Sequence, residues 1–242
     1  MRLATYQTGK SIILYDADSV CDADSAPQIG PALFDPAEWR RMGHVTGQAP
    51  GRGTSLFLDA GTDEWVLRIY RRGGRIARLS ERRYVWTGLP ATRAFREFHL
   101  TATLHAQGLP VPRPVAAGVT RYGLTYEAAL ITVRIPGARA LAELLIADEA
   151  DDTLLKRVGA TIRRFHDAGL DHVDLNARNL LVDEKGQVWL IDLDRCRLRS
   201  RGSWQQNNLK RLERSLEKTS FKQSSSLISQ GYIENPLRAR VK

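Results

Sequence analysis

The chain has 242 residues, a length that fits one large domain or a protein of two lobes. At 43% hydrophobic and 26% charged residues, it has an ordinary globular composition that can bury a core. No apolar run approaches the roughly 18 residues that span a bilayer. The N-terminus lacks the apolar core of a signal peptide, and two cysteines are too few for a disulfide framework. We therefore expect cytosolic synthesis and residence.

The net charge of +9 comes from the C-terminal end of the chain. Residues 195–242 hold 12 Lys and Arg against 3 Asp and Glu, so the first 194 residues are neutral overall. A second basic cluster lies in a loop around residues 68–83. A basic tail and a basic loop indicate an anionic partner, which could be nucleic acid, an anionic membrane surface or a phosphorylated substrate. The alternative is solvated charge that only aids solubility.

The N-terminal half begins with residues 1–35, an acidic segment with one expected strand at Ile12–Tyr15 and no assigned role. A glycine-rich loop around Gly51 and Gly53 then precedes a predicted strand–turn–strand unit that ends in Trp65–Tyr70. Glycines at such a position let backbone N–H groups approach a phosphate, although a glycine-rich hairpin can also be a plain turn.

Helical spacing of apolar residues predicts a helix over residues 92–107. Glu97 in its first half is either an ordinary surface glutamate or a functional residue placed to pair with Arg68 on the preceding strand. An extended connector, two strands and a break at Arg134–Gly137 follow, and we place a hinge between two lobes at this break. Two further helices are expected over residues 140–147 and 152–168.

The most informative stretch contains His172, Asp174, Asn179 and Asp192. Two short apolar runs, separated by the turn-forming residues 183–186, predict a β-hairpin between Asn179 and Asp192. Such a hairpin lets these two oxygen ligands face one another across its mouth and hold a hard cation. Asp174 would remain to orient an attacking hydroxyl, which is the arrangement that phosphoryl transfer requires.

The C-terminal part contains a predicted basic amphipathic helix over residues 204–218. Its apolar stripe of Leu209, Leu212 and Leu216 can dock on the protein, while its basic side can rest on anionic headgroups. No element is assigned to residues 224–242.

The order of the predicted elements resembles the protein-kinase-like fold. It runs from the glycine-rich loop through the strand with Arg68, the helix with Glu97 and the hinge to the hairpin between Asn179 and Asp192. The sequence from His172 to Asn179 matches the catalytic-loop pattern H-R-D-L-x-x-x-N except that Val173 replaces the Arg, and Asp192 starts the triplet that stands in place of D-F-G. More narrowly, the chain resembles the bacterial 3-deoxy-D-manno-octulosonic acid (Kdo) kinases of lipopolysaccharide assembly. The stretches that carry this resemblance are Gly51–Thr54, Trp65–Gly74, His172–Ala177, Ile191–Arg195 and Trp204–Leu212.

The resemblance implies an α+β fold of two lobes. We expect an N-terminal extension over 1–35, a small β-rich N-lobe with one main helix over 36–133, and a larger, mostly helical C-lobe over 134–242. It also implies ATP-dependent phosphorylation of the 4-hydroxyl of Kdo on a lipid A precursor. The enzyme would attach peripherally to the cytoplasmic face of the inner membrane through the basic loop and the C-terminal helix.

The family pattern suggests a role for each site residue. Asp174 would be the catalytic carboxylate, and Asn179 and Asp192 would hold Mg²⁺ that bridges the ATP phosphates. The nucleotide would be bound by Gly51 and Gly53, which close over its phosphates, and by Arg68, which pairs with Glu97. Arg68 takes the place of the usual lysine, and whether Arg68 or Arg71 anchors the phosphates stays open, as does whether Asn176 does more than shape the loop.

Val173 and the missing A-P-E segment disfavour activation-loop phosphorylation and a peptide substrate. Two other functions are weighed. A soluble small-molecule kinase of the aminoglycoside or choline type shares the fold but takes cationic substrates, which suit a basic C-terminus poorly. A catalytically inactive kinase-like module could bind nucleic acid through the basic tail, but the intact set of Asp174, Asn179 and Asp192 argues against it. We expect neither a nucleic acid nor a protein partner.

Overall fold

The computed structural model describes residues 1–21, 26, 28–49, 55–71, 83–217 and 222–234. Gly51, Gly53, most of the basic loop and the last residues of the basic tail lie outside this part of the chain. The chain forms two compact units, unit 1 with residues 1–102 and 112–134, and unit 2 with residues 103–111 and 135–242. The boundary between residues 134 and 135 falls within the sequence where the hinge is predicted. Both units are built from helices and antiparallel strands, which confirms the α+β class.

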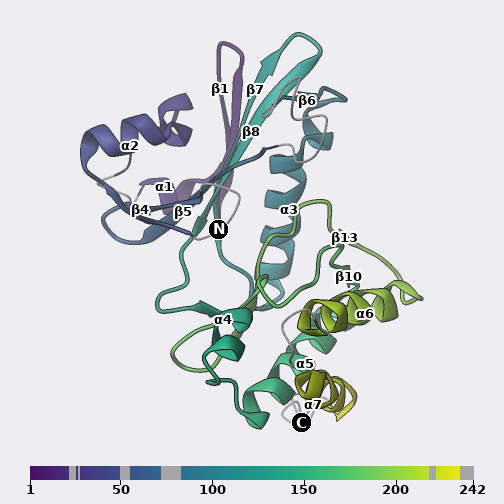
Figure 1. The fold of residues 1–242 in the computed structure, drawn as a ribbon. Coiled ribbons are helices and arrows are strands. Elements are labelled where there is room, and N and C mark those ends of the chain that lie inside the picture. The colour runs from purple at the N-terminus through teal and green to yellow at the C-terminus, as the bar shows by residue number, and fades with distance from the viewer. Residues whose placement is uncertain (22–25, 27, 50–54, 72–82, 218–221, 235–242) are drawn as a thin grey trace. The chain divides into compact units, whose positions relative to one another are not determined.

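Unit 1 is organised around an eight-stranded antiparallel sheet of order β1-β2-β7-β8-β5-β4-β3, with β6 paired to β8 (Figure 1). Alternating buried positions along β4 and β5 show why these segments become strands, since every second side chain (Leu56 and Leu58 on β4, Trp65 and Leu67 on β5) enters the same hydrophobic core. The strands are β1 (Leu3–Thr8), β2 (Ser11–Asp16), β3 (Val45–Gln48), β4 (Ser55–Asp59), β5 (Glu64–Ile69), β6 (Tyr84–Val85), β7 (Pro114–Tyr122) and β8 (Thr125–Val133).

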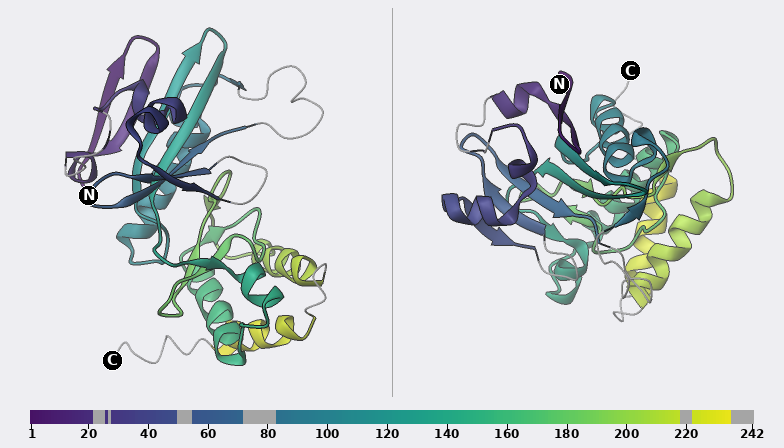
Figure 2. Two further views of the ribbon diagram at one scale, coloured as in Figure 1. Left: turned by 60° about the vertical axis from the view of Figure 1, so that its left-hand side comes forward. Right: turned by 90° about the horizontal axis from the view of Figure 1, so that it is seen from above.

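The two faces of this sheet carry separate hydrophobic cores. Helix α3 (Arg93–Ala106) covers one face, where Phe95 and Phe98 are buried against Leu130 and its neighbours. The other face is covered by η1 (Pro31–Phe34) and α2 (Pro36–Met42) (Figures 1 and 2). Leu33 and Trp39 from these two elements are buried in its core. Unit 1 also contains the short helices α1 (Ala17–Cys21) and η3 (Leu89–Ala91). The sheet is therefore sandwiched between helical segments.

The first sixteen residues are part of this sheet. Sequence analysis expected one short strand there, whereas the structure has two, and β2 pairs with β7 so that Ile13 lies opposite Gly118. Ile13 is buried in the core on the η1 face of the sheet. Residues 3–16 therefore extend the sheet of unit 1 rather than lying apart from it.

Unit 2 is mainly helical, as predicted for the C-terminal half. Its helices are α4 (Leu141–Ile146), α5 (Asp152–Asp167), α6 (Trp204–Glu217) and α7 (Lys222–Glu234), and its short strands are β9 (Arg139–Ala140), β10 (Leu170–Asp171), β11 (Leu180–Val182), β12 (Val188–Leu190) and β13 (Arg197–Leu198). Asp151 caps α5 by accepting a hydrogen bond from the Leu154 amide at 2.7 Å. The helix ends at Asp167, and two residues later Gly169 turns the chain away with a φ of 84°, which is easily adopted only without a Cβ.

Helix α7 is packed closely against α5. A Cβ on Gly159 of α5 would lie 1.9 Å from the carbonyl oxygen of Ile228, and one on Gly231 of α7 would lie equally close to the carbonyl oxygen of Lys156. The two glycines therefore allow the helix backbones to touch (Figure 1). No helix in the described residues is both long and apolar enough to span a membrane.

Candidate active site

Arg68 and Glu97 form an ion pair in unit 1, which is the functional interpretation of Glu97. Arg68 lies on β5 with its side chain toward α3, and its Nη2 atom donates to Oε1 of Glu97. The hydroxyl of Tyr70 donates to the other carboxylate oxygen, Oε2. The guanidinium also lies over the Tyr70 ring, with Cζ 4.8 Å from the ring centroid. Tyr70 is thus a third member of the cluster, which sequence analysis did not identify.

Glu97 is the buried member of this ion pair. The side chain of Glu97 is 4% exposed, and a carboxylate removed from water to that degree needs donors on both oxygens. Arg68 keeps 26% of its side chain exposed, so this side chain remains partly accessible. Arg71 lies beyond the end of β5 and is exposed, and Glu97 pairs with Arg68. The arrangement favours Arg68 over Arg71 as the cation that would meet phosphate.

In unit 2, the loop from Asp174 to Asn179 is closed by its own asparagines. The side-chain amides of Asn176 and Asn179 both donate to the carbonyl oxygen of Asp174, each at 2.9 Å. Oδ1 of Asn176 accepts from the backbone amides of Arg178 at 2.9 Å and Asn179 at 3.3 Å. Asn176 therefore shapes the loop, and the Asp174 carboxylate projects from a fixed backbone with its side chain exposed.

The predicted hairpin is present as β11 and β12, with Leu180 opposite Leu190. The ladder continues one step further because the amide of Ile191 donates to the carbonyl oxygen of Asn179 at 3.1 Å. Asn179 thus lies opposite Ile191, one position short of the predicted partner Asp192. At Asp192 the backbone turns into the left-handed region with φ of 60°. Non-glycine residues rarely adopt this conformation, and those that do gather at functional sites.

Asp171, which sequence analysis did not single out, anchors the start of the catalytic loop. Its carboxylate accepts from Nδ2 of Asn208 at 2.9 Å and from Nη1 of Arg199 at 3.0 Å. Burial by itself raises the pKa of Asp171, but these hydrogen bonds and the charges of Arg199 and Arg197 outweigh it and hold the pKa below its usual value. Asn208 is buried on α6, so the network ties that helix to the residue preceding His172.

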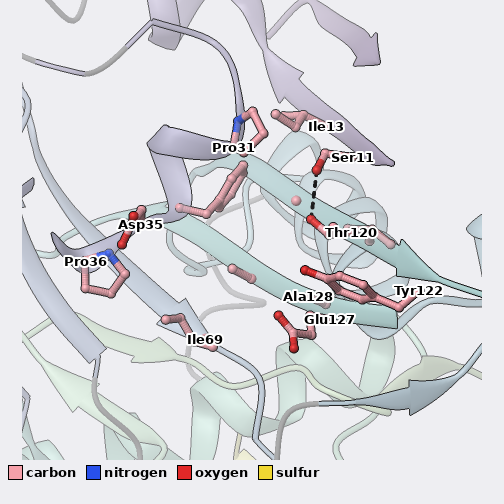
Figure 3. Close-up of a pocket in the computed structure, with 14 residues that line it drawn as sticks. Ser11, Ile13, Pro31, Asp35, Pro36, Ile69, Thr120, Tyr122, Glu127 and Ala128 are labelled. Atoms are coloured by element: carbon pink, nitrogen blue, oxygen red, sulfur yellow. Dashed lines mark hydrogen bonds between the residues drawn. The ribbon is translucent and has the colours of Figure 1, made fainter. Parts of the chain in front are cut away.

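A hollow of about 320 Å³ lies elsewhere in unit 1, on the face of the sheet that η1 covers. Figure 3 shows its floor on β2, β7 and β8, where the hydroxyls of Ser11 and Thr120 are 2.9 Å apart. Glu127 and Tyr122 lie at one side, and Pro31 at the other. The hollow shares no residue with the cluster of Arg68, Tyr70 and Glu97.

Comparison with known proteins identifies the family. Residues 37–230 match the Lipopolysaccharide kinase (Kdo/WaaP) family. The chain belongs to this family. It is 40% identical over 217 residues to the 3-deoxy-D-manno-octulosonic acid kinase of Vibrio parahaemolyticus, covering 90% of this chain and 89% of the relative. Over 198 residues it is 44% identical to the kinase of the same name from Xylella fastidiosa strain 9a5c, covering 81% and 79%.

Family membership confirms the expected protein-kinase-like fold and makes the protein a phosphotransferase. The residues brought together by unit 2 fit the metal that a kinase requires. Asn179 uses Nδ2 within the loop, which leaves Oδ1 free to accept a cation, and Asp192, one residue beyond the hydrogen-bonded Ile191, would provide a carboxylate oxygen. Within the described residues no three His, Cys, Asp or Glu side chains form a metal cluster. An amide and one carboxylate suit Mg²⁺, which keeps waters and binds substrate phosphates.

Proposed function

We propose that this protein transfers the γ-phosphoryl group of ATP to the 4-hydroxyl of the Kdo residue on a lipid A precursor. The observation that carries the proposal is the loop of Asp174 and Asn179, joined by a backbone hydrogen bond to Ile191, the residue directly before Asp192, in a chain whose relatives are named as Kdo kinases. Those names favour a sugar acid as acceptor over the cationic substrates of aminoglycoside and choline kinases.

In this mechanism Asp174 orients the sugar hydroxyl and accepts its proton late in the transfer. The hydroxyl oxygen forms a bond to the γ-phosphorus, and the bond from that phosphorus to the β–γ bridging oxygen breaks, so ADP leaves. Asn179 and Asp192 would hold Mg²⁺, which would neutralise negative charge on the ATP phosphates. Arg68, fixed by Glu97, would bind the ATP phosphates, and Gly51 and Gly53 would close over them.

We further propose that the protein acts at the cytoplasmic face of the inner membrane through electrostatic contact. On α6, Leu212 and Leu216 are buried at 2% and 1%, so this part of its apolar stripe is used in packing unit 2. Lys210 and Arg214 on the same helix are exposed. A helix with this pattern would meet anionic headgroups with its cations and would not insert an apolar face.

The proposal is tested by incubating the purified protein with ATP, Mg²⁺ and a Kdo-bearing lipid A precursor. We expect the product to gain one phosphate by mass, and NMR to place it on the 4-position. Asp174→Ala should abolish transfer while ATP binding stays close to that of wild type. Glu184→Ala, which removes an exposed carboxylate from the β11–β12 turn, is the matched control. An unchanged acceptor mass with the wild-type protein would refute the assigned substrate.

A further inference from the structure

The arginines of unit 2 differ in what their guanidinium groups contact. The four between residues 195 and 201 are paired with acidic residues: Arg197 and Arg199 with Asp171, Arg201 with Asp167, and Arg195 with Asp194 at 4.0 Å. Six further arginines donate hydrogen bonds to a carboxylate or a backbone carbonyl oxygen, namely Arg139, Arg157, Arg163, Arg164, Arg211 and Arg214. Within the described part of the chain, Arg178 is the one arginine of unit 2 whose guanidinium has no hydrogen bond or ion pair.

Arg178 lies in the catalytic loop, four residues after Asp174 and directly before Asn179. Its backbone is fixed, because its amide donates to Oδ1 of Asn176 at 2.9 Å. The same Asn176 side chain holds the carbonyl of Asp174. One asparagine thus sets the backbone positions of both the catalytic carboxylate and an exposed cation with no internal partner.

We propose that Arg178 binds the carboxylate of the acceptor sugar and thereby selects a sugar acid as the substrate. This inference rests on the proposed function, since an octulosonic acid carries a carboxylate on the same sugar as the hydroxyl to be phosphorylated. The planar guanidinium matches a carboxylate with two parallel hydrogen bonds. Because Arg178 and Asp174 share one braced loop, holding the carboxylate positions the hydroxyl near Asp174.

The same cation could instead bind the phosphoryl group in transfer, and the two roles differ in which substrate they affect. An arginine on the acceptor carboxylate changes the KM for the acceptor and leaves ATP binding and slow ATP hydrolysis unaltered. An arginine on the transferred phosphoryl group lowers kcat for every acceptor, including water.

The experiment is a cycle that pairs a change in the enzyme with a change in the acceptor. Wild type and Arg178→Gln are assayed with the Kdo-bearing lipid A precursor and with the same acceptor whose Kdo carboxyl is converted to the primary amide. We expect Arg178→Gln to raise the KM for the natural acceptor about tenfold to a hundredfold, the range for a charge-assisted hydrogen bond. Replacing the carboxylate of the acceptor by the amide should raise the KM of wild type by a similar factor. The same replacement should raise the KM of Arg178→Gln little further.

Two controls complete the design. Lys185→Gln removes one exposed positive charge from the β11–β12 turn and should leave both KM values unchanged. Arg178→Lys keeps the positive charge but lacks the planar guanidinium that makes two parallel hydrogen bonds. It should therefore recover only part of the affinity for the acceptor that Arg178→Gln loses. Independent, multiplicative effects of the two changes, or a loss seen equally in acceptor-free ATP hydrolysis, would overturn the proposal. Failure of wild type to phosphorylate the acceptor would instead overturn the proposed function.

Discussion

Nε2 of His172 lies 3.0 Å from the carbonyl oxygen of Ile191, the residue directly before Asp192. Because a carbonyl can only accept, Nε2 must carry the proton. Burial lowers the pKa of His172, although its bond to Ile191 and the charges of Asp192 and Asp174 oppose the shift. The ring is therefore a neutral, buried link between the start of the loop that contains Asp174 and the strand that leads to Asp192, the proposed metal ligand.

Breaking this link should displace Asp192 more than Asp174. We expect His172→Leu to raise the Mg²⁺ concentration for half-maximal activity several-fold and to lower kcat about tenfold, because it leaves the Ile191 carbonyl without its donor. His172→Gln, whose amide can donate, should retain part of the activity. The measurement is a Mg²⁺ titration of initial rate at saturating ATP and acceptor. An unchanged Mg²⁺ requirement in His172→Leu would contradict the positioning role.

Tyr70 should matter for ATP and not for the acceptor. Its hydroxyl donates to Glu97 and lies 3.4 Å from Nη2 of Arg68, so Tyr70→Phe removes one hydrogen bond from a buried carboxylate while keeping the ring beneath the guanidinium. We expect the KM for ATP to rise about tenfold with kcat little changed. Tyr6→Phe on the exposed strand β1 is the control. A fall in kcat at unchanged KM would show that Tyr70 acts elsewhere.

The features predicted from sequence are those that short-range patterns specify. The β11–β12 hairpin follows from two apolar runs around a turn, and the Arg68–Glu97 pair follows from a strand and a helix that pack face to face. The helices predicted over 92–107, 152–168 and 204–218 are present with ends that differ by at most one residue.

The features that sequence analysis did not predict depend on contacts distant along the chain. The pairing of β2 with β7 joins residues about a hundred positions apart, and no local pattern encodes that register. Helix α7 has a weak amphipathic pattern because small residues, Gly231 among them, meet α5. The Asp171–Asn208 bond also joins separate elements, and a single aspartate before a histidine carries no signal for its partner.

The Asp171–Asn208 bond gives a third prediction. Nδ2 of Asn208 donates to Asp171 and also to the carbonyl oxygen of Trp204 at 2.7 Å, so Asn208→Ala leaves two buried acceptors each short of a donor. We expect a loss of about 1–3 kcal/mol in the free energy of unfolding, measured by urea titration. Because the loop starts at Asp171, kcat should also fall while the KM for ATP stays constant. The neighbouring variant Asn207→Ala, at an exposed position, should behave as wild type.

Acid sensitivity should come in part from His166. Burial lowers the pKa of this histidine to about 4, and the charge of Arg163 adds to the shift while Asp167 and Asp171 oppose it. Its unfolded-state pKa is about 6.5, so the unfolded chain binds the proton more tightly between these values. The stability from neutral His166 is therefore complete above pH about 6.5 and is lost as the pH falls toward 4, by about 3 kcal/mol.

This prediction is checked by urea unfolding of wild type and His166→Phe between pH 7.5 and about 4.5. The phenyl ring can keep the edge contact with Trp204, whose ring centroid is 5.2 Å away, but it loses the hydrogen bond to the Tyr232 hydroxyl. The variant should be less stable at pH 7.5 and should show a smaller loss on acidification. Parallel pH profiles for the two proteins would show that His166 does not carry this titration.

The close packing of α5 and α7 should make Gly159 intolerant of any side chain. Alanine in a helix interior normally stabilises by about 1 kcal/mol relative to glycine. At Gly159, however, the added Cβ would meet the backbone of Ile228 and lie 2.6 Å from the amide nitrogen of Tyr232, and backbone atoms cannot rotate away. We expect Gly159→Ala to destabilise the protein by about 1–3 kcal/mol or more, with faster amide hydrogen exchange in α7.

Gly202→Ala is the control, because its Cβ would come no closer than 3.5 Å to Trp204. If the urea concentration at the midpoint of unfolding is the same for Gly159→Ala and wild type, the two helices do not pack at this distance in solution.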